Sequence, residues 1–419
     1  MSARATLEAL FRDGLAAVDP EPATRRWALD RQRRTHDVAH HVLAIGKAAG
    51  AMARGFVAAG VAPVGRGLVV TRDGHAPGPP AFETRFAGHP LPDARSAAAG
   101  EAALAFAARV PASDTLVVLV SGGASALVAC PVAGVPLADL ARVTEALMRA
   151  GADIAALNRV RKRLSRVAGG GLLAASGTAS VEVALVSDVP GDAPGVIGSG
   201  PCWPGDDGSA APLDDVVRAM GDAVPSAVRR ALAHRRPETA RSVRPPHRIV
   251  ARNADAVAGM AREAARRGLR AVALDEPLHG EARAAGAALV AASRARPGPA
   301  VLLAGGETTV TVAGHGRGGR NQEVALGAAL ALASGGPPAV SVLAAGTDGS
   351  DGPTDAAGAF ADASTVARGR ARGVDAAAAL AANDAYSFFA AEGGIFRTGP
   401  TGTNVMDVAL VGISLGPGR

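Results

Sequence analysis

Short runs of β-branched and aliphatic residues alternate along this chain with longer stretches in which apolar residues recur every three or four positions. The short runs predict buried strands, and the longer stretches predict helices that cover them. This alternation is typical of an α/β fold with a parallel-rich sheet. In the N-terminal half the predicted strands are residues 41–45, 67–71, 115–120 and 181–187, and the predicted helices are 47–59, 93–109, 137–150 and 154–167.

A polar, proline-bearing segment (RRPETARSVRPPH) interrupts this pattern at about residues 235–247 and predicts a linker. We therefore expect two domains, residues 1–238 and residues 248–419. An amphipathic N-terminal helix is predicted from Leu7, Leu10, Phe11 and Leu15, which fall on one helical face. After the linker the predicted strands are 248–251, 270–274, 300–304, 308–312, 340–343 and 405–411, with a helix that starts near Asn321.

Composition favours a globular protein of the cytoplasm. The 419 residues are 48% hydrophobic and 20% charged, and no apolar run reaches the roughly 18 to 20 residues of a membrane helix. The N-terminus lacks the basic start and apolar core of a secretory signal. Two cysteines, Cys130 and Cys202, are too few for a disulfide framework.

The net charge of +6 has two interpretations. It attracts anionic substrates, or it reflects only a heavy use of arginine. Nucleic acid is not an expected partner, because the chain has no zinc-finger spacing, no aromatic RNA-binding strand and no continuous basic stripe. Of the 44 basic residues only Lys47 and Lys162 are lysines. A retained lysine favours a role as a compact point charge for a phosphate.

Two glycine-rich turns follow predicted strands, where backbone amides can hold an anion. Residues 44–50 (AIGKAAG) contain Gly46 and Lys47, and we expect Lys47 in the first turn of a helix, where a bound phosphate offsets the unfavourable dipole. An ordinary surface lysine is the alternative. Residues 121–126 (SGGASA) bring Ser121, Gly122, Gly123 and Ser125 after an apolar strand, and a simple tight turn is the alternative there.

A third glycine-rich segment, residues 314–323 (GHGRGGRNQE), contains a formal G-x-G-x-x-G. A dinucleotide site requires an acidic residue about 20 positions further on, and that stretch has none, so we discount a nicotinamide site. Arg317 and Arg320 lie beside glycine amides instead. An arginine fork such as that of Arg320 clamps phosphoryl oxygens.

Several acids and histidines are candidates for metal or substrate binding. Asp188 follows a predicted strand, Asp348, Asp351 and Asp355 lie in residues 346–355 (GTDGSDGPTD), and Glu307 follows a glycine pair. Carboxylates of this kind hold Mg²⁺ together with nucleotide phosphates, although Asp-Gly pairs also simply form turns. Among the histidines, His75 and His89 follow strands and His315 lies in the third glycine segment, as substrate contacts or as packing residues.

Taken together these segments resemble a known family. Residues 44–50, 87–93 (AGHPLPD), 120–127 (VSGGASAL), 158–165 (NRVRKRLS) and 187–201 (SDVPGDAPGVIGSGP) are similar to the N-terminal region of class II glycerate 2-kinases. Residues 304–323, 346–358, 383–389 (NDAYSFF) and 398–405 (TGPTGTNV) resemble their C-terminal MOFRL region. The motifs occur in the family's order and span about residues 5 to 412.

The resemblance implies transfer of a phosphoryl group from ATP to the 2-hydroxyl of D-glycerate. It also implies a Rossmann-like N-terminal domain, a MOFRL-type α/β domain and an active site in the cleft between them. The family's catalytic lysine and arginine fall on Lys47 and Arg320.

Within that reaction we expect residues 121–125, together with residues of the C-terminal region, to cradle the ATP phosphates, and Gly46 to contact the nucleotide or the substrate. We expect Mg²⁺ at Asp188 or Asp348, and Asp188 as the catalytic base. The other candidates for nucleotide or substrate binding are His89, Asn158, Glu307, Asn321, Asp351, Thr401 and Asn404.

Three positions depart from the family pattern: Ala156 replaces a glutamate, Arg163 a histidine and Ala168 a lysine. These departures leave open a non-catalytic sensor of hydroxy acids on the same scaffold. A hydroxypyruvate reductase, a label given to some relatives of this family, is the other alternative, and it would need a nicotinamide site. The expected partners are glycerate and ATP, with no nucleic acid and no membrane, and a homodimer is compatible with the sequence.

Overall fold

The computed structural model describes residues 2–32, 38–60, 64–149, 154–177, 179–204, 218, 224–233, 243–337 and 339–415. The chain forms two compact units. The first unit is Pro20–Ala251, and the second combines Met1–Asp19 with Arg252–Arg419. These bounds differ from the predicted domains, because the N-terminal helix belongs to the second unit. Residues 235–242 of the predicted linker lie outside the described residues, and its last residue, His247, begins a strand of the first unit.

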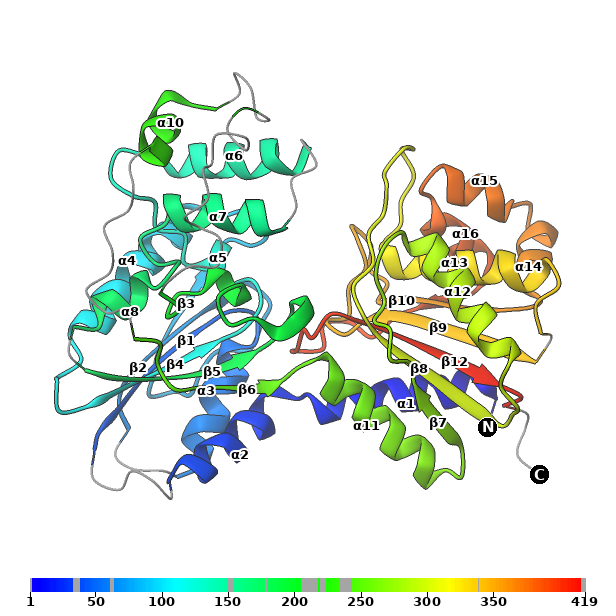
Figure 1. The fold of residues 1–419 in the computed structure, drawn as a ribbon, viewed down its shortest axis with the longest axis horizontal. Coiled ribbons are helices and arrows are strands. Elements are labelled where there is room, and N and C mark those ends of the chain that lie inside the picture. The colour runs from blue at the N-terminus through cyan, green and yellow to red at the C-terminus, as the bar shows by residue number, and fades with distance from the viewer. Residues whose placement is uncertain are drawn as a thin grey trace. The chain divides into compact units, whose positions relative to one another are not determined.

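The first unit contains a six-stranded sheet in which all neighbouring strands are parallel (Figure 1). The strand order is β3–β2–β1–β4–β5–β6, which is the order of Rossmann folds. The predicted Rossmann-like sheet is thereby confirmed. Its strands are β1 (His40–Ile45), β2 (Val64–Arg72), β3 (Glu83–Ala87), β4 (Thr115–Val120), β5 (Ser180–Val186) and β6 (His247–Ala251).

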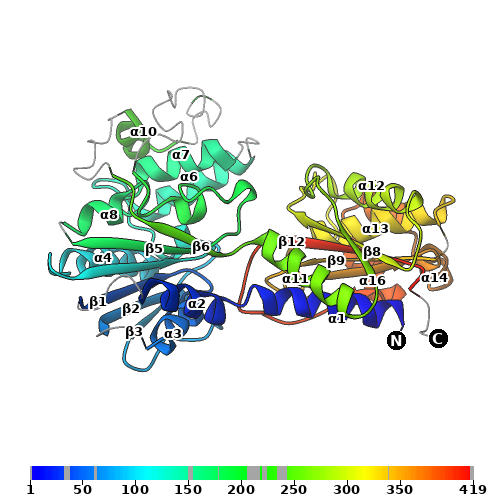
Figure 2. The same cartoon turned by 60° about the horizontal axis from the view of Figure 1, so that its bottom comes forward.

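Helices cover both faces of this sheet (Figure 2). On one face lie α2 (Pro20–Gln32) and α3 (Ala49–Ala58), and on the other lie α4 (Ala94–Ala108), α5 (Ala124–Leu127) and α8 (Gly171–Ala175). Because both faces are covered, every residue of the central strands β1 and β4 is buried. This explains why β4 reads as a run of apolar residues without polar alternation.

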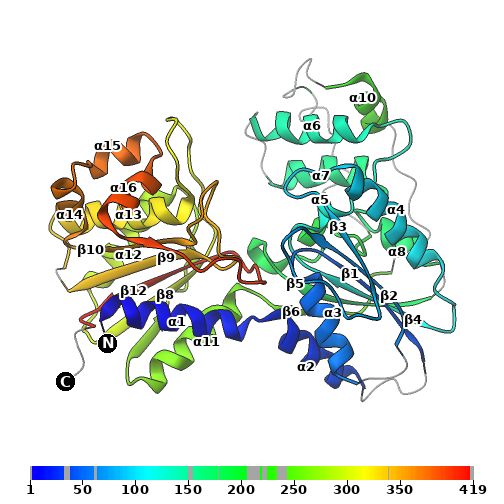
Figure 3. The same cartoon turned by 180° about the vertical axis from the view of Figure 1, so that it is seen from behind.

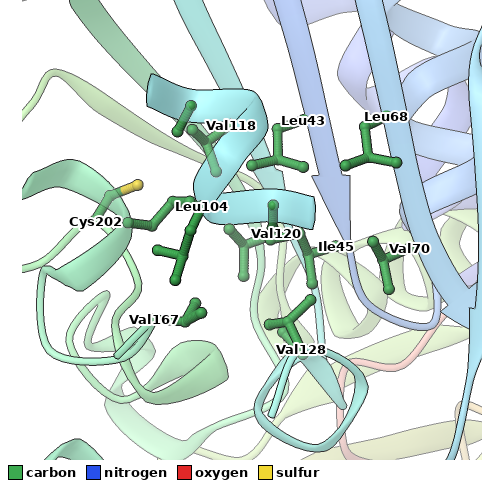
Figure 4. Close-up of a cluster of buried hydrophobic side chains, with 14 of the residues drawn as sticks. Leu43, Ile45, Leu68, Val70, Leu104, Val118, Val120, Val128, Val167 and Cys202 are labelled. Carbon is green, nitrogen blue, oxygen red and sulfur yellow. The ribbon is translucent and has the colours of Figure 1, made fainter. Parts of the chain in front are cut away.

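The core on the α4 side is built from alternate residues of the central strands (Figure 4). Leu43 and Ile45 of β1 lie beside Val118 and Val120 of β4, because side chains two residues apart on a strand share a face. The remaining side chains labelled in the figure are Leu68, Val70, Leu104, Val128, Val167 and Cys202. Both cysteines of the chain, Cys130 and Cys202, are free and buried, in agreement with the prediction of no disulfide framework.

A further helical layer of the first unit consists of α6 (Leu137–Arg149), α7 (Ile154–Leu164) and α10 (Ser226–Ala233). It has its own apolar cluster, which includes Val143, Leu157, Val160 and Val228. The loop after β5 contains two short 3₁₀ helices, η1 (Pro190–Asp192) and η2 (Ile197–Ser199), and η2 contacts both α5 and α7. The glycine turn after β4 and the helix α7 are therefore joined through η2.

The second unit is built on a mixed six-stranded sheet in the order β11–β10–β9–β12–β8–β7. Only the β7–β8 pair is parallel, and the other neighbours are antiparallel. Its strands are β7 (Arg270–Ala273), β8 (Ala300–Gly306), β9 (Val340–Gly346), β10 (Gly358–Asp362), β11 (Ile395–Phe396) and β12 (Asp407–Ile413).

Helices also cover both faces of the second sheet (Figure 3). The predicted N-terminal helix is α1 (Ala3–Ala17), which packs with α11 (Asn253–Arg266) on one face and buries Leu7, Leu10 and Phe11 completely. The Phe11 ring meets the ring of Phe396 edge to face, with 5.2 Å between centroids. The helices near the other face are α12 (Ala282–Arg294), α13 (Arg320–Ala333), α14 (Thr365–Ala371), α15 (Ala376–Ala381) and α16 (Ala385–Glu392).

Some predicted elements were wrong in detail. No strand forms at residues 308–312, where Thr309 makes only an isolated bridge to Glu281 and Val312 is 75% exposed. The apolar alternation there reflects a loop that lies along the start of α12. The helix predicted from residue 47 begins at Ala49. The short strands β3, β10 and β11 were not predicted. No described helix is long and apolar enough to cross a membrane.

Candidate active site

Two glycine-rich turns of the first unit meet at the point where the strand order of the sheet reverses. The turn after β1 contains Gly46 and Lys47, and the turn after β4 contains Ser121, Gly122 and Gly123. In open α/β sheets, the crevice at this reversal, beyond the carboxyl ends of the strands, is where ligands bind. The fold therefore brings together two segments that are more than 70 residues apart in the sequence.

Hydrogen bonds lock the two turns to each other. The amide of Ser121 donates to the carbonyl of Ile45 at 3.0 Å, and the amide of Lys47 donates to the carbonyl of Gly122 at 2.9 Å. The Ser121 hydroxyl accepts from the amide of Ala48 at 3.0 Å. Ser121 is 2% exposed, so its hydroxyl braces the turns. The sequence predicted Ser121 as a ligand contact, and that role stays a prediction.

Gly123 provides the open surface of this junction. Its φ of 84° lies in the left-handed region that favours glycine. A Cβ on Gly123 would lie 2.9 Å from Cδ2 of His89 and 3.3 Å from Cγ of Lys47. The side chains of Lys47 and His89 therefore converge over a bare backbone. A cation beside exposed glycine amides is suited to binding a phosphate.

The structure corrects the expected position of Lys47. It lies in the turn before α3, with Ala48 as the residue that precedes the helix. Lys47 therefore does not oppose the helix dipole from within the first turn of α3. His75 instead holds the lysine backbone, because its Nδ1 donates to the Lys47 carbonyl at 2.9 Å. His75 acts here as a brace for the lysine.

A chain of polar side chains links the second turn to α7. The hydroxyls of Ser125 and Ser199 are 2.8 Å apart, and the Ser199 hydroxyl donates to Oδ1 of Asn158 at 3.1 Å. Ser199 has a positive φ of 60°, and Asn158 is 5% exposed. Ser125 and Asn158 were both predicted, and the fold places them in one network. Ser199 was missed, since nothing in the sequence distinguishes it from its loop neighbours.

Asp188 lies two residues beyond β5, the strand next to β4, as the sequence predicted. Within the described part of the chain, no group of three or more His, Cys, Asp or Glu side chains is arranged to hold a metal ion. Mg²⁺ in kinase sites is commonly bound through one or two carboxylates, with phosphates and water as the other ligands. A single carboxylate at Asp188, near turns suited to phosphate, fits that kind of binding.

In the second unit, the guanidinium of Arg320 forms hydrogen bonds with two acids, Asp407 and Glu307. Its Nη2 donates to Oδ1 of Asp407 at 3.1 Å and its Nε donates to Oδ2 of the same carboxylate, while Nη1 donates to Glu307. Arg320 is the first residue of α13, as predicted. Asp407 begins β12 and is 2% exposed. Asp407 was not predicted from the sequence, although an acid at the start of a buried apolar strand is a signal that could have found it.

Burial and charge act in opposite directions on this cluster. Burial alone lowers the pKa of Arg320, but the adjacent Asp407 and Glu307 outweigh it and raise that pKa above the usual value. Burial raises the pKa of Asp407 to about 6, against the opposing effect of the Arg320 charge. The guanidinium is therefore fixed as a cation, and its orientation depends on a carboxylate that titrates near neutral pH.

Asp351 stabilises the start of α13, the helix that begins with Arg320. Its carboxylate accepts from the backbone amides of Asn321 and Gln322 at 3.0 and 2.8 Å and also from both of their side-chain amides. Burial raises the pKa of Asp351. These bonds satisfy amides at the start of α13, so Asp351 caps this helix. Both Asn321 and Asp351 were predicted as ligand contacts, and the bonds observed here position Arg320.

Other predicted residues gather at the ends of β9 and β12. The Thr401 hydroxyl donates to the Thr347 carbonyl at 2.6 Å, and the Thr401 amide donates to the Asp348 carbonyl at 3.3 Å. Asn404 accepts the amide of Met406 at 3.1 Å. The carboxylate of Asp348 accepts from the amide and hydroxyl of Ser350. The loops that carry Asp348, Thr401 and Asn404 are thereby fixed against one another.

The third glycine segment differs from its prediction, because it follows a loop where a strand was expected. The guanidinium carbon of Arg317 lies 4.8 Å from the ring centroid of Tyr386. The Tyr386 hydroxyl donates to Asp355 at 2.7 Å, and Arg397 donates to the same carboxylate at 2.9 Å. Asp355 is therefore part of a surface network with Tyr386 and Arg397.

The three departures from the family pattern have distinct surroundings. Ala156 joins the apolar cluster of the α6–α7–α10 layer. Arg163 donates to the carbonyl of Leu232 in the last turn of α10 at 3.4 Å. Ala168 is 6% exposed and lines a small pocket beside Ser125. Ala156 thus serves packing, Arg163 makes a hydrogen bond between two helices, and Ala168 lines the pocket beside the polar network.

Comparisons with known proteins agree with this architecture. Residues 6–233 match DUF4147, described as a domain of unknown function, and residues 300–407 match the MOFRL family. A protein of Thermotoga maritima named D-glycerate 2-kinase is 39% identical over 88% of this chain and 89% of its own length. A protein of Agrobacterium vitis, 37% identical over 98% of this chain and 94% of its own, has a name that proposes a hydroxypyruvate reductase.

A solved structure extends the likeness to three dimensions. The crystal structure of glycerate kinase from Thermotoga maritima superposes with a TM-score of 0.83 and 34% identity, covering 97% of this chain and 98% of that one. The fold and these matches define an α/β protein that combines a Rossmann-like DUF4147 unit with a MOFRL unit. This chain belongs to the glycerate kinase family.

Proposed function

We propose that this protein is a glycerate 2-kinase that transfers the γ-phosphoryl group of ATP to the 2-hydroxyl of D-glycerate. The observation that carries the proposal is the convergence of Lys47 and His89 over the bare backbone of Gly123. That arrangement lies at the strand-order reversal of a Rossmann-like sheet, where a small anionic ligand is expected.

In the proposed reaction the 2-hydroxyl oxygen attacks the γ-phosphorus of ATP. A new phosphorus–oxygen bond forms, the bond to the β–γ bridging oxygen breaks, and ADP leaves with that electron pair. The hydroxyl proton passes to a carboxylate, for which Asp188 is our candidate. The products are 2-phosphoglycerate, ADP and a proton. Asp188 or Asp348 would hold Mg²⁺, which would neutralise part of the phosphate charge when bound.

The chain's cations supply the remaining stabilisation. Lys47 places a compact charge next to the glycine amides, where it stabilises the transferring group and the leaving phosphate. Arg320 provides a fork that is held by Asp407 and Glu307. A guanidinium that is already oriented loses less entropy when it binds an oxyanion. In this proposal the catalytic pair is Lys47 and Arg320, and Asp407 is a positioning residue.

The test is an assay of the full chain with ATP, MgCl₂ and D-glycerate. We expect release of ADP and, by ³¹P nuclear magnetic resonance, a phosphate on the 2-hydroxyl. Lys47→Ala is the matched inactive control. A protein that releases no ADP with any small hydroxy acid contradicts the proposal.

Hydroxypyruvate reductase is the second candidate, favoured by the Rossmann strand order and by the Agrobacterium vitis name. Against it, the two turns at the strand-order reversal contain no G-x-G-x-x-G, and the segment that does contain one belongs to the second unit. Oxidation of NADH with hydroxypyruvate, in the absence of ATP, distinguishes the reductase from the kinase. Cytoplasmic location and a homodimer stay predictions.

A further inference from the structure

A small pocket of the first unit lies directly beside the polar network of Ser125, Ser199 and Asn158. It has a volume of about 60 Å³ and is bounded by the loop at Pro90, by α6, by α7 and by the 3₁₀ helix η2. Most of its lining is apolar. The polar groups are Arg161, two hydroxyls of the network, Ser165 and Thr144.

Arg161 is the cation of this pocket. It belongs to the last turn of α7 and is half-buried. Within the described residues it makes no hydrogen bond and no ion pair, whereas nearby Arg163 and Arg166 each have a bonded oxygen acceptor. Burial lowers the pKa of Arg161, with no acid to oppose that effect. Partial burial of a guanidinium without an acid partner is unfavourable, and an anionic ligand would offset that cost.

A structural explanation for Arg161 is the favourable placement of a cation near the carboxyl end of a helix. That effect is available to an exposed side chain and does not require burial. It also gives no reason for hydroxyl groups to line the same pocket. A favourable position near the end of a helix therefore explains neither the partial burial of Arg161 nor the hydroxyl groups that line its pocket.

The hydroxyls define what kind of molecule fits. The single proton of Ser199 is used in its bond to Asn158, so Ser125 donates to Ser199 across their 2.8 Å separation. The lone pairs of Ser125 then remain available to accept a hydroxyl proton from a ligand. A pocket with one cation and one hydroxyl acceptor is complementary to a small hydroxy acid.

We propose that Arg161 binds the carboxylate of the acceptor hydroxy acid in this pocket, with Ser125 as a hydroxyl contact. The proposal rests on the proposed kinase function and names the carboxylate subsite of that reaction. Ala168 lines the pocket with a small side chain, and a small pocket of this kind suits a short hydroxy acid such as glycerate.

The first experiment compares Arg161→Gln with Arg159→Gln. Arg159 belongs to the same helix but does not line the pocket. We expect the KM for D-glycerate to rise roughly 10- to 100-fold in Arg161→Gln, the loss expected for a hydrogen-bonded charge pair, with the KM for ATP unchanged. The wild-type protein should prefer D-glycerate over its neutral amide by a similar factor, and Arg161→Gln should lose that preference. Equal kinetics in the two variants would overturn the proposal.

A second variant and a binding measurement keep the test decisive if Arg161→Gln folds poorly. Ala141→Leu fills the pocket from α6 without touching Arg161's charge, and it should weaken D-glycerate binding by calorimetry while ATP binding persists. Unchanged D-glycerate binding in Ala141→Leu contradicts the proposed location. If the wild-type protein binds D-glycerate through Arg161 but releases no ADP, the kinase proposal fails and the carboxylate site stands.

Discussion

The backbone amide of Lys47 donates a 2.9 Å hydrogen bond to the carbonyl of Gly122. This bond is one of three that join the turn after β1 to the turn after β4, at the reversal of the strand order. It orients the lysine backbone so that the side chain passes over Gly123, where His89 also lies. The position of the lysine charge is therefore set by the backbone of both turns.

Replacement of Lys47 tests the role of that charge. We expect Lys47→Ala to lower kcat by about 100-fold or more, because a positioned cation in phosphoryl transfer acts mainly in the transition state. Thermal unfolding should change little. Lys47→Arg should recover only part of the activity, since a planar fork does not replace a compact ammonium. A parallel loss of folding and activity in Lys47→Ala would assign the lysine a structural role.

Gly123→Ala tests the bare surface of the site, and Gly134→Ala is its matched control. Both glycines have similar positive φ values, 84° and 80°, so both substitutions carry the same backbone strain of about 1 kcal/mol. A Cβ at Gly134 meets nothing within 4 Å, whereas a Cβ at Gly123 meets His89 and Lys47. We expect comparable losses of stability by chemical denaturation, with a large loss of kcat only in Gly123→Ala. Equal activity in the two variants would contradict the proposal that a phosphate binds over Gly123.

Asp407→Asn tests whether the ion pair with Asp407 orients the guanidinium of Arg320. The isosteric amide keeps the shape but removes the charge, so we expect kcat to fall by roughly 10-fold or more as the fork loses its orientation. Glu307→Gln, whose side chain is 34% exposed, should have a smaller effect. A larger loss of kcat in Glu307→Gln than in Asp407→Asn would show that Glu307, and not Asp407, is the main residue that orients Arg320.

The same carboxylate predicts an acid limit for activity. Because burial raises the pKa of Asp407 to about 6, lowering the pH through 6 protonates it and breaks its ion pair with Arg320. We expect kcat to decline below about pH 6. In Asp407→Asn this limb should be absent from the pH profile, although overall activity is lower. An unchanged acid limb in the variant assigns the titration to another group.

His40 predicts a pH dependence of stability. It is fully buried at the start of β1, its ring nitrogens have no hydrogen-bond partner among the described residues, and burial lowers its pKa to about 4. The charge of Arg31 acts in the same direction, the nearby His41 adds a weaker lowering effect, and Glu182 and Asp114 oppose it. Between pH 6.5 and 4, His40 binds a proton in the unfolded chain but stays neutral in the folded protein. The stability from His40 is thus complete above pH 6.5 and is lost as the pH falls toward 4, by about 3 kcal/mol.

The variant His40→Leu should remove this part of the acid sensitivity. Urea unfolding at pH 7.5 and at pH 4.5 measures the free-energy difference in each protein. His279→Leu is the control, because the His279 side chain is 64% exposed and should leave the pH dependence as it is in the wild-type protein. Identical pH dependence in His40→Leu and the wild-type protein would exclude His40 as the cause.

The sequence and the structure agree best where local pattern and packing require the same thing. The central strands β1 and β4 were predicted within one residue, because complete burial on both faces demands an unbroken apolar run. The strand at residues 308–312 was predicted from an alternating pattern (TTVTV), but these residues form a loop. Thr309 and Thr311 instead bond to Gly280 and Glu281, just before α12, and the one bridge there is isolated.

By itself the sequence determined the α/β class, the glycine turns, the lysine among the arginines and the family motifs, since each depends on residue type and local spacing. It could not place Ser199 beside Asn158, assign Asp407 to Arg320, or leave Arg161 half-buried without an acid. The first two relationships join residues that are 41 and 87 positions apart in the sequence. The third is the lack of an acid beside Arg161. Only the tertiary structure decides which side chains meet across such distances, because strand order and helix packing bring them together or keep them apart.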